Sequence, residues 1–175
     1  MHKIPRIFLY FAAACLIWTV SGCATTELHA KPGTRTTLIL IRHTERTMVT
    51  KVLTPEGQER AQALVDAVSG MDIKAVYSPD LVRNKDTVRP LVESLGIPIT
   101  LVPEHEIKTL PETLLARHPG ETVLWVGNKG NLEEIYLRLG GKGEPPVTYG
   151  DLFIVTVPDR GAATVEKKHF GEKIF

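Results

Sequence analysis

The sequence contains little cysteine and no excess of charge of either sign. Its two cysteines are Cys15 and Cys23, so the body of the chain has neither a disulfide scaffold nor a thiol nucleophile. No internal repeat, glycine-rich phosphate loop or His/Cys cluster with metal-site spacing is present. The net charge of +1 gives no reason to expect nucleic acid as a partner. A length of 175 residues and an ordinary hydrophobic content of 43% predict one globular domain.

The N-terminal apolar run is short. Residues 7–20 are uncharged, but 14 residues are fewer than the roughly 20 that a membrane-spanning helix needs. The run follows a basic segment, 2–6, and has the length of a signal-peptide core. It ends in Val-Ser-Gly followed by Cys23, which resembles a bacterial lipobox. That resemblance implies a lipid on Cys23; an ordinary secretory signal or an uncleaved anchor is the alternative.

These features predict three regions of the chain. Residues 1–22 are predicted to be a lipoprotein signal peptide, 23–35 a lipidated tether, and 36–175 the folded domain. Ala24 is not the aspartate of an inner-membrane retention signal. The predicted location is therefore the cell envelope, tethered to the outer membrane and facing the periplasm.

Strand-like and helix-like segments alternate along the domain. Apolar patterns predict strands at 37–41, 74–77, 97–102, 122–127, 151–157 and 163–169, and helices at 54–70, 80–95, 111–118 and 131–139. Pro90 is expected to break or kink the second helix, 103–110 to form a polar loop, and Asn131 to cap the last helix. The alternation predicts an α/β fold, a three-layer α/β/α sandwich with a mostly parallel sheet and a hairpin at one edge.

Polar residues follow the predicted strands. Arg42 and His43 follow the first strand, Arg83 lies just after the second, and Asn128 and Lys129 follow the fourth. Ligand chemistry in open α/β sheets gathers at the carboxyl ends of the strands, so we expect a pocket there. Two guanidinium groups suit a phosphoryl group, and a neutral imidazole between them can attack phosphorus to form a phosphohistidine.

Four segments resemble motifs of the histidine phosphatase superfamily, which includes the phosphoglycerate mutases. The Arg-His-Thr-Glu segment at 42–45 resembles the family's Arg-His-Gly/Ala-Glu motif. Residues 53–61 are similar to its Leu-Thr-x-x-Gly helix start, 76–87 to its Tyr-Ser-Ser-x-Leu-x-Arg segment, and 123–132 to its Val-Leu-Val-Val-Gly-His segment. The motifs occur in the family's order and cover nearly the whole predicted domain.

The resemblance implies a role for three residues. His43 is implied as the nucleophile, and Arg42 and Arg83 as phosphate-binding residues. It implies a phosphoglycerate mutase-like fold, no metal or other cofactor, and a phosphorylated small molecule, phosphohistidine or phosphoprotein as the substrate.

Asn128 departs from the family pattern, because the family carries a second pocket histidine at this position. Asparagine donates a hydrogen bond but carries no charge, and loss of one charge-stabilising donor typically costs about 10²- to 10³-fold in rate. Lys129 could restore the charge or point to solvent. Asn128 itself could bind phosphate or cap the following helix.

The resemblance implies a general acid in the segment after the third strand, where the family often carries a carboxylate. Glu104, His105 and Glu106 lie there, and Glu104 is the candidate that we favour. The alternative is that these are ordinary loop residues.

The residues therefore support a leading function and two rivals. The leading one is a tethered, metal-independent phosphohydrolase that acts through a phosphohistidine. The first rival is a weakened or inactive member that binds a phosphorylated ligand or a protein partner at the cell envelope, which Asn128 favours. The second is an envelope scaffold with a relic pocket.

Overall fold

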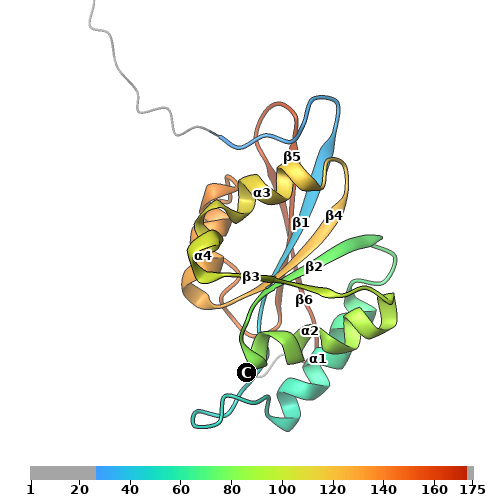
Figure 1. The fold of residues 1–175 in the computed structure, drawn as a ribbon, viewed down its shortest axis with the longest axis vertical. Coiled ribbons are helices and arrows are strands. Elements are labelled where there is room, and N and C mark those ends of the chain that lie inside the picture. Colours follow the sequence, from blue (N-terminus) through green and yellow to red (C-terminus); the bar gives the residue numbers. More distant parts are fainter. Residues whose placement is uncertain (1–26, 173–175) are drawn as a thin grey trace, which may run out of the picture.

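A mixed β-sheet crosses the middle of the computed structural model, which describes residues 27–172 (Figure 1). Within these residues the sheet has six strands, in the order β3-β2-β4-β1-β5-β6. The strands are β1 Arg35–Arg42, β2 Ile73–Pro79, β3 Ile99–Val102, β4 Thr122–Gly127, β5 Asp151–Pro158 and β6 Thr164–His169. The first four in spatial order are parallel, and β5 and β6 form an antiparallel hairpin at one edge. The predicted α/β class, mostly parallel sheet and edge hairpin are confirmed.

Helices cover both faces of the sheet. They are α1 Pro55–Ala67, α2 Val82–Leu95, α3 Leu110–Arg117 and α4 Lys129–Arg138, with a 3₁₀ helix, η1, at Glu104–Thr109. Leu38 and Leu40 of β1 pack on the face covered by α3 and α4, whereas Ile39 and Ile41 pack on the face covered by α1 and α2. All four side chains are fully buried, because alternate residues of a central strand enter opposite cores.

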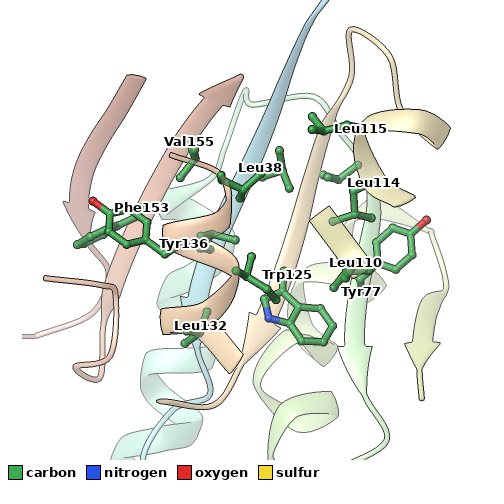
Figure 2. Packing of buried hydrophobic residues seen from close by; sticks show 14 of the residues in the cluster. Leu38, Tyr77, Leu110, Leu114, Leu115, Trp125, Leu132, Tyr136, Phe153 and Val155 are labelled. Atoms are coloured by element: carbon green, nitrogen blue, oxygen red, sulfur yellow. The ribbon is translucent and has the colours of Figure 1, made fainter. Parts of the chain in front are cut away.

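The core under α3 and α4 is the more aromatic of the two. Trp125 from β4, Tyr136 from α4 and Phe153 from β5 fill it together with leucines of α3 and α4 (Figure 2). The rings of Tyr136 and Phe153 meet edge to face with centroids 5.6 Å apart. This packing seats α4 on the sheet and so fixes the position of its N-terminus beside the end of β4.

Two local predictions are wrong, and a third is narrowed. The second helix continues through Pro90 as α2, so of the predicted break or kink the break does not occur; Val88 and Leu91 on either side of Pro90 are buried. The segment predicted as a polar loop contains η1, anchored by the buried Ile107. The helix cap is Asn128 rather than Asn131, because α4 begins at Lys129.

The start of the described chain packs on the domain. Leu28 lies against the core, and the backbone N–H of Ala30 donates to the carbonyl of Pro158 at 2.9 Å. The predicted signal segment and Cys23 lie outside the described residues, so those predictions and the domain boundaries derived from them stay predictions. Across residues 27–172, no helix is long and apolar enough to cross a membrane.

Candidate active site

His43 lies directly after β1 and is held by two hydrogen bonds. Its backbone N–H donates to the carbonyl of Gly127 at the end of β4, at 3.1 Å. Its ring Nδ1 lies 2.8 Å from the carbonyl oxygen of Thr44. A carbonyl only accepts, so Nδ1 carries the proton and the neutral ring presents an unprotonated Nε2.

The His43 imidazole is neutral at physiological pH. The pKa of His43 is lowered to about 4, chiefly by burial and also by the positive charges of Arg42, Arg83 and Arg46, against the opposing effect of the Thr44 hydrogen bond. Only 3% of the residue is exposed. A neutral imidazole whose Nε2 carries a lone pair is the form that can attack phosphorus.

Thr44 joins the turn after His43 to α2. Its backbone N–H donates to Oγ1 of Thr87 at 3.0 Å, and Thr87 Oγ1 in turn donates to the carbonyl of Arg83 at 2.8 Å. One hydroxyl therefore links the backbone beside His43 to the backbone of a candidate phosphate-binding arginine, Arg83.

Glu45 and Arg60 form a buried ion pair beneath the same turn. The Nε of Arg60 donates to both carboxylate oxygens at 3.0 Å, and Nη2 lies 2.8 Å from Oε1. The side chains are only 15% and 5% exposed. Arg60 Nη1 also donates to the carbonyl of Phe170 at 2.8 Å, so the pair ties the turn to α1 and to the chain after β6.

Gly57 explains how α1 reaches this turn. A Cβ at this position would lie 2.1 Å from the carbonyl oxygen of Glu45, so only glycine permits the approach. Thr54 caps the helix as predicted, its Oγ1 accepting from the Gly57 N–H at 3.2 Å, and Pro55 occupies the first helical position.

Arg42, the last residue of β1, contacts the segment before β5. Its Nη1 donates to the carbonyl of Val147 at 2.9 Å, and its guanidinium carbon lies 3.9 Å from the ring centroid of Tyr149. The Tyr149 ring is also 5.7 Å from the His43 ring. Burial lowers the pKa of Arg42, the tyrosine opposing that effect. Tyr149 is a site residue that no motif in the sequence indicates.

Gly150 fixes the backbone next to Tyr149. Its φ is +85°, in the left-handed region, and a Cβ there would lie 2.3 Å from Cε1 of His169 and 2.7 Å from Nη1 of Arg60. The aromatic ring over Arg42 is therefore set by close packing against the arginine that also supports Glu45.

Arg83 and Asn128 meet across the site. Asn128 Oδ1 accepts from Nε and Nη2 of Arg83 at 3.3 and 3.0 Å. The backbone N–H of Asn128 donates to Asn131 Oδ1 at 2.7 Å, so Asn131 contributes to the cap from the third helical position, as in a capping box. Asn128 thus occupies the N-cap position and also binds Arg83.

Glu104 lines a pocket beside this pair. The pocket has a volume of about 530 Å³ and includes Arg83, Asn128 and Glu104. Glu106 is not on its wall, and His105 is 82% exposed. The structure therefore places one of the three candidates, Glu104, next to the arginine and asparagine of the site.

Lys129 lies elsewhere. It is exposed and lines a separate groove of about 800 Å³ with Glu133, Lys167 and residues before β5. The additional cation near His43 is instead Arg46. Its positive charge lowers the pKa values of Arg42, His43 and Arg83. Nothing in the motifs indicates Arg46.

The described residues offer no alternative metal centre. Between residues 27 and 172, no three His, Cys, Asp or Glu side chains are grouped so that they could hold a metal ion. The positive charge at the site comes from guanidinium groups, which can bind phosphate oxygens in pairs.

Comparison with known proteins gives a family-level result. Residues 38–108 match the model of the histidine phosphatase superfamily, branch 1, a range that includes Arg42, His43, Arg83 and Glu104 but not Asn128. A search of curated proteins found no match. Solved structures with the same fold cover about three quarters of the chain.

Three of these structures show the similarity in fold. The protein histidine phosphatase SixA complexed with tungstate is 15% identical, with a TM-score of 0.65, over 76% of this chain and 96% of that one. Phosphoglycerate mutase from Bacillus anthracis is 14% identical, with a TM-score of 0.59, over 77% and 93%. The alpha-ribazole phosphatase from Shigella flexneri is 16% identical, with a TM-score of 0.54, over 74% and 94%.

The family model and the structural neighbours support the histidine phosphatase superfamily. The fold is α/β and phosphoglycerate mutase-like, as expected from the sequence. In this fold, the segments at 42–45 and 123–132 meet at the carboxyl ends of the adjacent strands β1 and β4.

Proposed function

We propose that this protein hydrolyses phosphate monoesters or phosphohistidine through a phosphohistidine intermediate on His43. The observation that supports the proposal most strongly is the His43 ring itself, which is neutral, has Nδ1 engaged by Thr44 and is flanked by arginines. The family-level similarity supports the same class of chemistry.

The proposed reaction has two displacements at phosphorus. In the first, the Nε2 lone pair forms an N–P bond while the bond from phosphorus to the leaving group breaks. In the second, water attacks phosphorus, the N–P bond breaks, and inorganic phosphate leaves with His43 neutral again. Arg42 and Arg83 hold the phosphoryl oxygens in both steps and offset their charge.

Proton transfer falls to Glu104 in this proposal. In its protonated form it gives a proton to the leaving oxygen, and as a carboxylate it accepts the proton of the attacking water. Its support is its place on the wall of the pocket that contains Arg83 and Asn128. Leu81, Val102 and Ile107 line the same pocket, which suits a leaving group with an apolar part.

Asn128 favours a second function, namely binding of a phosphorylated ligand or protein partner with little turnover. Its side chain is a neutral amide whose oxygen is already engaged by Arg83. It can offer one further hydrogen bond to phosphate but no positive charge, which would limit stabilisation of the transition state.

The proposed location is the periplasmic face of the outer membrane, with a lipid on Cys23. Support comes from the lipobox-like sequence and from the direction of β1, because the described chain enters β1 at Arg35 and His43 follows the other end of this strand (Figure 1). The eight residues of β1 separate these ends by about 25 Å. A molecule tethered in this way would turn its pocket away from the membrane. Continued membrane association of Cys23→Ser would contradict the lipid anchor.

The test of the function is turnover by the full chain, purified in detergent, with aryl phosphates and phosphohistidine peptides. Wild type should release phosphate, and His43→Ala should be slower by about 10⁴-fold or more. Equal rates in the two proteins would refute the hydrolase proposal and leave the binding function.

A further inference from the structure

We propose that Arg46 is a third phosphate-binding arginine, which supplies the positive charge that Asn128 lacks. The proposal rests on the proposed function, because it concerns the same site. It deepens that function by assigning the pocket to groups with two negative charges. The motifs assign Arg46 no role, and four observations carry the inference.

The first observation is the position of Arg46 in a closed loop. It follows His43 by three residues and pairs with Leu53 across an isolated antiparallel bridge. The loop is also closed by hydrogen bonds from the Thr47 N–H to the Val52 carbonyl at 2.9 Å and from the Thr54 N–H to the Glu45 carbonyl at 3.0 Å. Arg46 is therefore held near the nucleophile by backbone structure.

The second observation is a pair of unsatisfied donors. The Nε atoms of Arg42 and Arg46 are both buried and have no hydrogen-bond partner anywhere in the part of the chain that the structure describes. Buried guanidinium donors without partners are costly and rare, so each calls for a partner that binds there. An oxyanion has enough acceptor oxygens to satisfy both.

The third observation is the state of the Arg46 fork. Its Nη1 donates to the carbonyl of Thr47 at 3.0 Å, which fixes one side of the guanidinium. The Nε and Nη2 groups form the edge that arginine uses to bind phosphate or carboxylate with two parallel hydrogen bonds. Within the described residues, neither group on this edge donates to a protein acceptor.

The fourth observation is uncompensated charge. Among residues 27–172, the ion pairs formed by arginines involve Arg60, Arg89 and Arg138 and none of the three at the site. The three are close enough to act on one another, and after burial the charge of Arg46 does most to lower the pKa of Arg83. A bound dianion would offset the mutual repulsion among these three charges.

The other candidate for the missing charge is Lys129. The sequence position beside Asn128 favours it, but the lysine is exposed and lines the groove next to β6 rather than the pocket of Arg83 and Asn128. Arg46 has both the proximity and the free donor edge that Lys129 lacks.

The experiment measures binding of tungstate and of inorganic phosphate to the full-length protein by titration calorimetry. Arg46→Gln should weaken both by about 10- to 100-fold, since one charge-assisted pair of hydrogen bonds is lost. Arg46→Lys should recover part of the affinity. Arg160→Gln, which removes an exposed arginine of the turn between β5 and β6, is the control and should bind as wild type.

A stability measurement separates this role from a structural one. Without ligand, Arg46→Gln should melt at the same temperature as wild type or higher, because it removes an unsatisfied buried donor and a repulsive charge. Added phosphate should raise the melting temperature less than in wild type. A lower melting temperature with unchanged affinity would assign Arg46 to the fold alone and overturn the proposal.

Exchange at Asn128 supplies a further test. If Arg46 replaces the missing charge, Asn128→His should improve phosphate affinity more in the Arg46→Gln background than in wild type. If the effects of the Asn128 and Arg46 substitutions on phosphate affinity are additive, Arg46 does not compensate for the missing histidine at position 128.

The outcomes distinguish this inference from the proposed function. Turnover by wild type with unchanged oxyanion affinity in Arg46→Gln would overturn the role of Arg46 and leave the hydrolase intact. Oxyanion binding that weakens in Arg46→Gln, without turnover by wild type, would support Arg46 and refute the hydrolase. Failure of the wild type to bind either oxyanion overturns the inference.

Discussion

The two sides of the candidate site are built differently. On the nucleophile side, His43, Thr44 and Glu45 are buried or nearly so, and each is bound to another element. On the leaving-group side, Asn128 holds Arg83, and Glu104 is an exposed residue at the start of η1. The nucleophile is therefore preorganised, whereas the candidate acid has no comparable support.

This difference indicates where the chemistry depends on the protein. Attack on phosphorus needs a neutral ring in a fixed orientation, which buried hydrogen bonds supply. Departure of a good leaving group needs little help, whereas a poor one needs a placed acid. We therefore propose that the preferred substrates are those whose leaving group is already good.

The largest expected effect is loss of the buried pair beneath the nucleophile. Arg60→Met leaves the Glu45 carboxylate largely buried without its partner, which should lower the free energy of unfolding by about 3–5 kcal/mol. Denaturant unfolding measures this value. Arg138→Met, which breaks an exposed pair with Glu112, is the control and should have little effect. Equal losses in the two variants would refute the special role of the buried pair.

The pH dependence of stability tests the neutral His43 ring. The pKa of His43 is about 4 when folded, against 6.5 when unfolded. As pH falls below 6.5, the unfolded chain takes up a proton that the folded chain does not, so the free energy of unfolding falls until about pH 4. The loss assigned to His43 amounts to about 3 kcal/mol.

His43→Gln should remove this part of the pH dependence, and His105→Gln, which changes an exposed histidine, should retain it. Unfolding curves at pH 7 and pH 4.5 provide the comparison. If the wild type and His43→Gln lose the same stability between these values, the ring titrates normally and the argument for a neutral buried nucleophile fails.

The leaving-group side is tested by changing the substrate as well as the residue. Glu104→Gln should lower kcat/KM by about 10²-fold for alkyl phosphates, which need an acid, and much less for nitrophenyl phosphate or phosphohistidine peptides. Glu106→Gln is the matched control, since Glu106 is not on the pocket wall. A loss that is the same for good and poor leaving groups would remove Glu104 from proton transfer.

Asn128→His should give the smallest effect. It restores an imidazole at the end of β4, and we expect kcat/KM to rise by about tenfold, less than the full value of a lost donor, because Arg83 loses the Asn128 oxygen that orients it. Steady-state rates with an aryl phosphate measure the change. An unchanged or lower rate would indicate that Asn128 does not occupy the position of the missing histidine.

Much of this architecture could be predicted from sequence because its signals are local. A few consecutive residues predict each of three elements: the apolar run predicts β1, the Thr-Pro pair predicts the start of α1, and the apolar segment before Asn128 predicts β4. The helix η1 could not be predicted, because Ile107 is its single buried residue and one apolar residue among polar ones shows no helical periodicity. Either Asn128 or Asn131 could cap a helix, and the end of β4 decides between them.

The supporting residues were beyond prediction for a different reason. Arg60 reaches Glu45 across 15 residues, and Tyr149 reaches Arg42 from the far end of the chain. Such contacts depend on strand order and close packing, as at Gly150, rather than on a motif. Arg46 directly follows the motif at 42–45. An arginine at that position does not by itself predict a role at the site, because the role depends on which residues surround it in the folded chain.

The most direct test is to trap phosphate on the protein. The full-length protein, mixed with an aryl phosphate and quenched at alkaline pH where phosphohistidine persists, should carry one phosphoryl group on the peptide that contains His43, as identified by mass spectrometry. The same peptide from His43→Ala should carry none. Turnover with no phosphate on His43, or with phosphate on another residue, would contradict the assignment of His43 as the nucleophile.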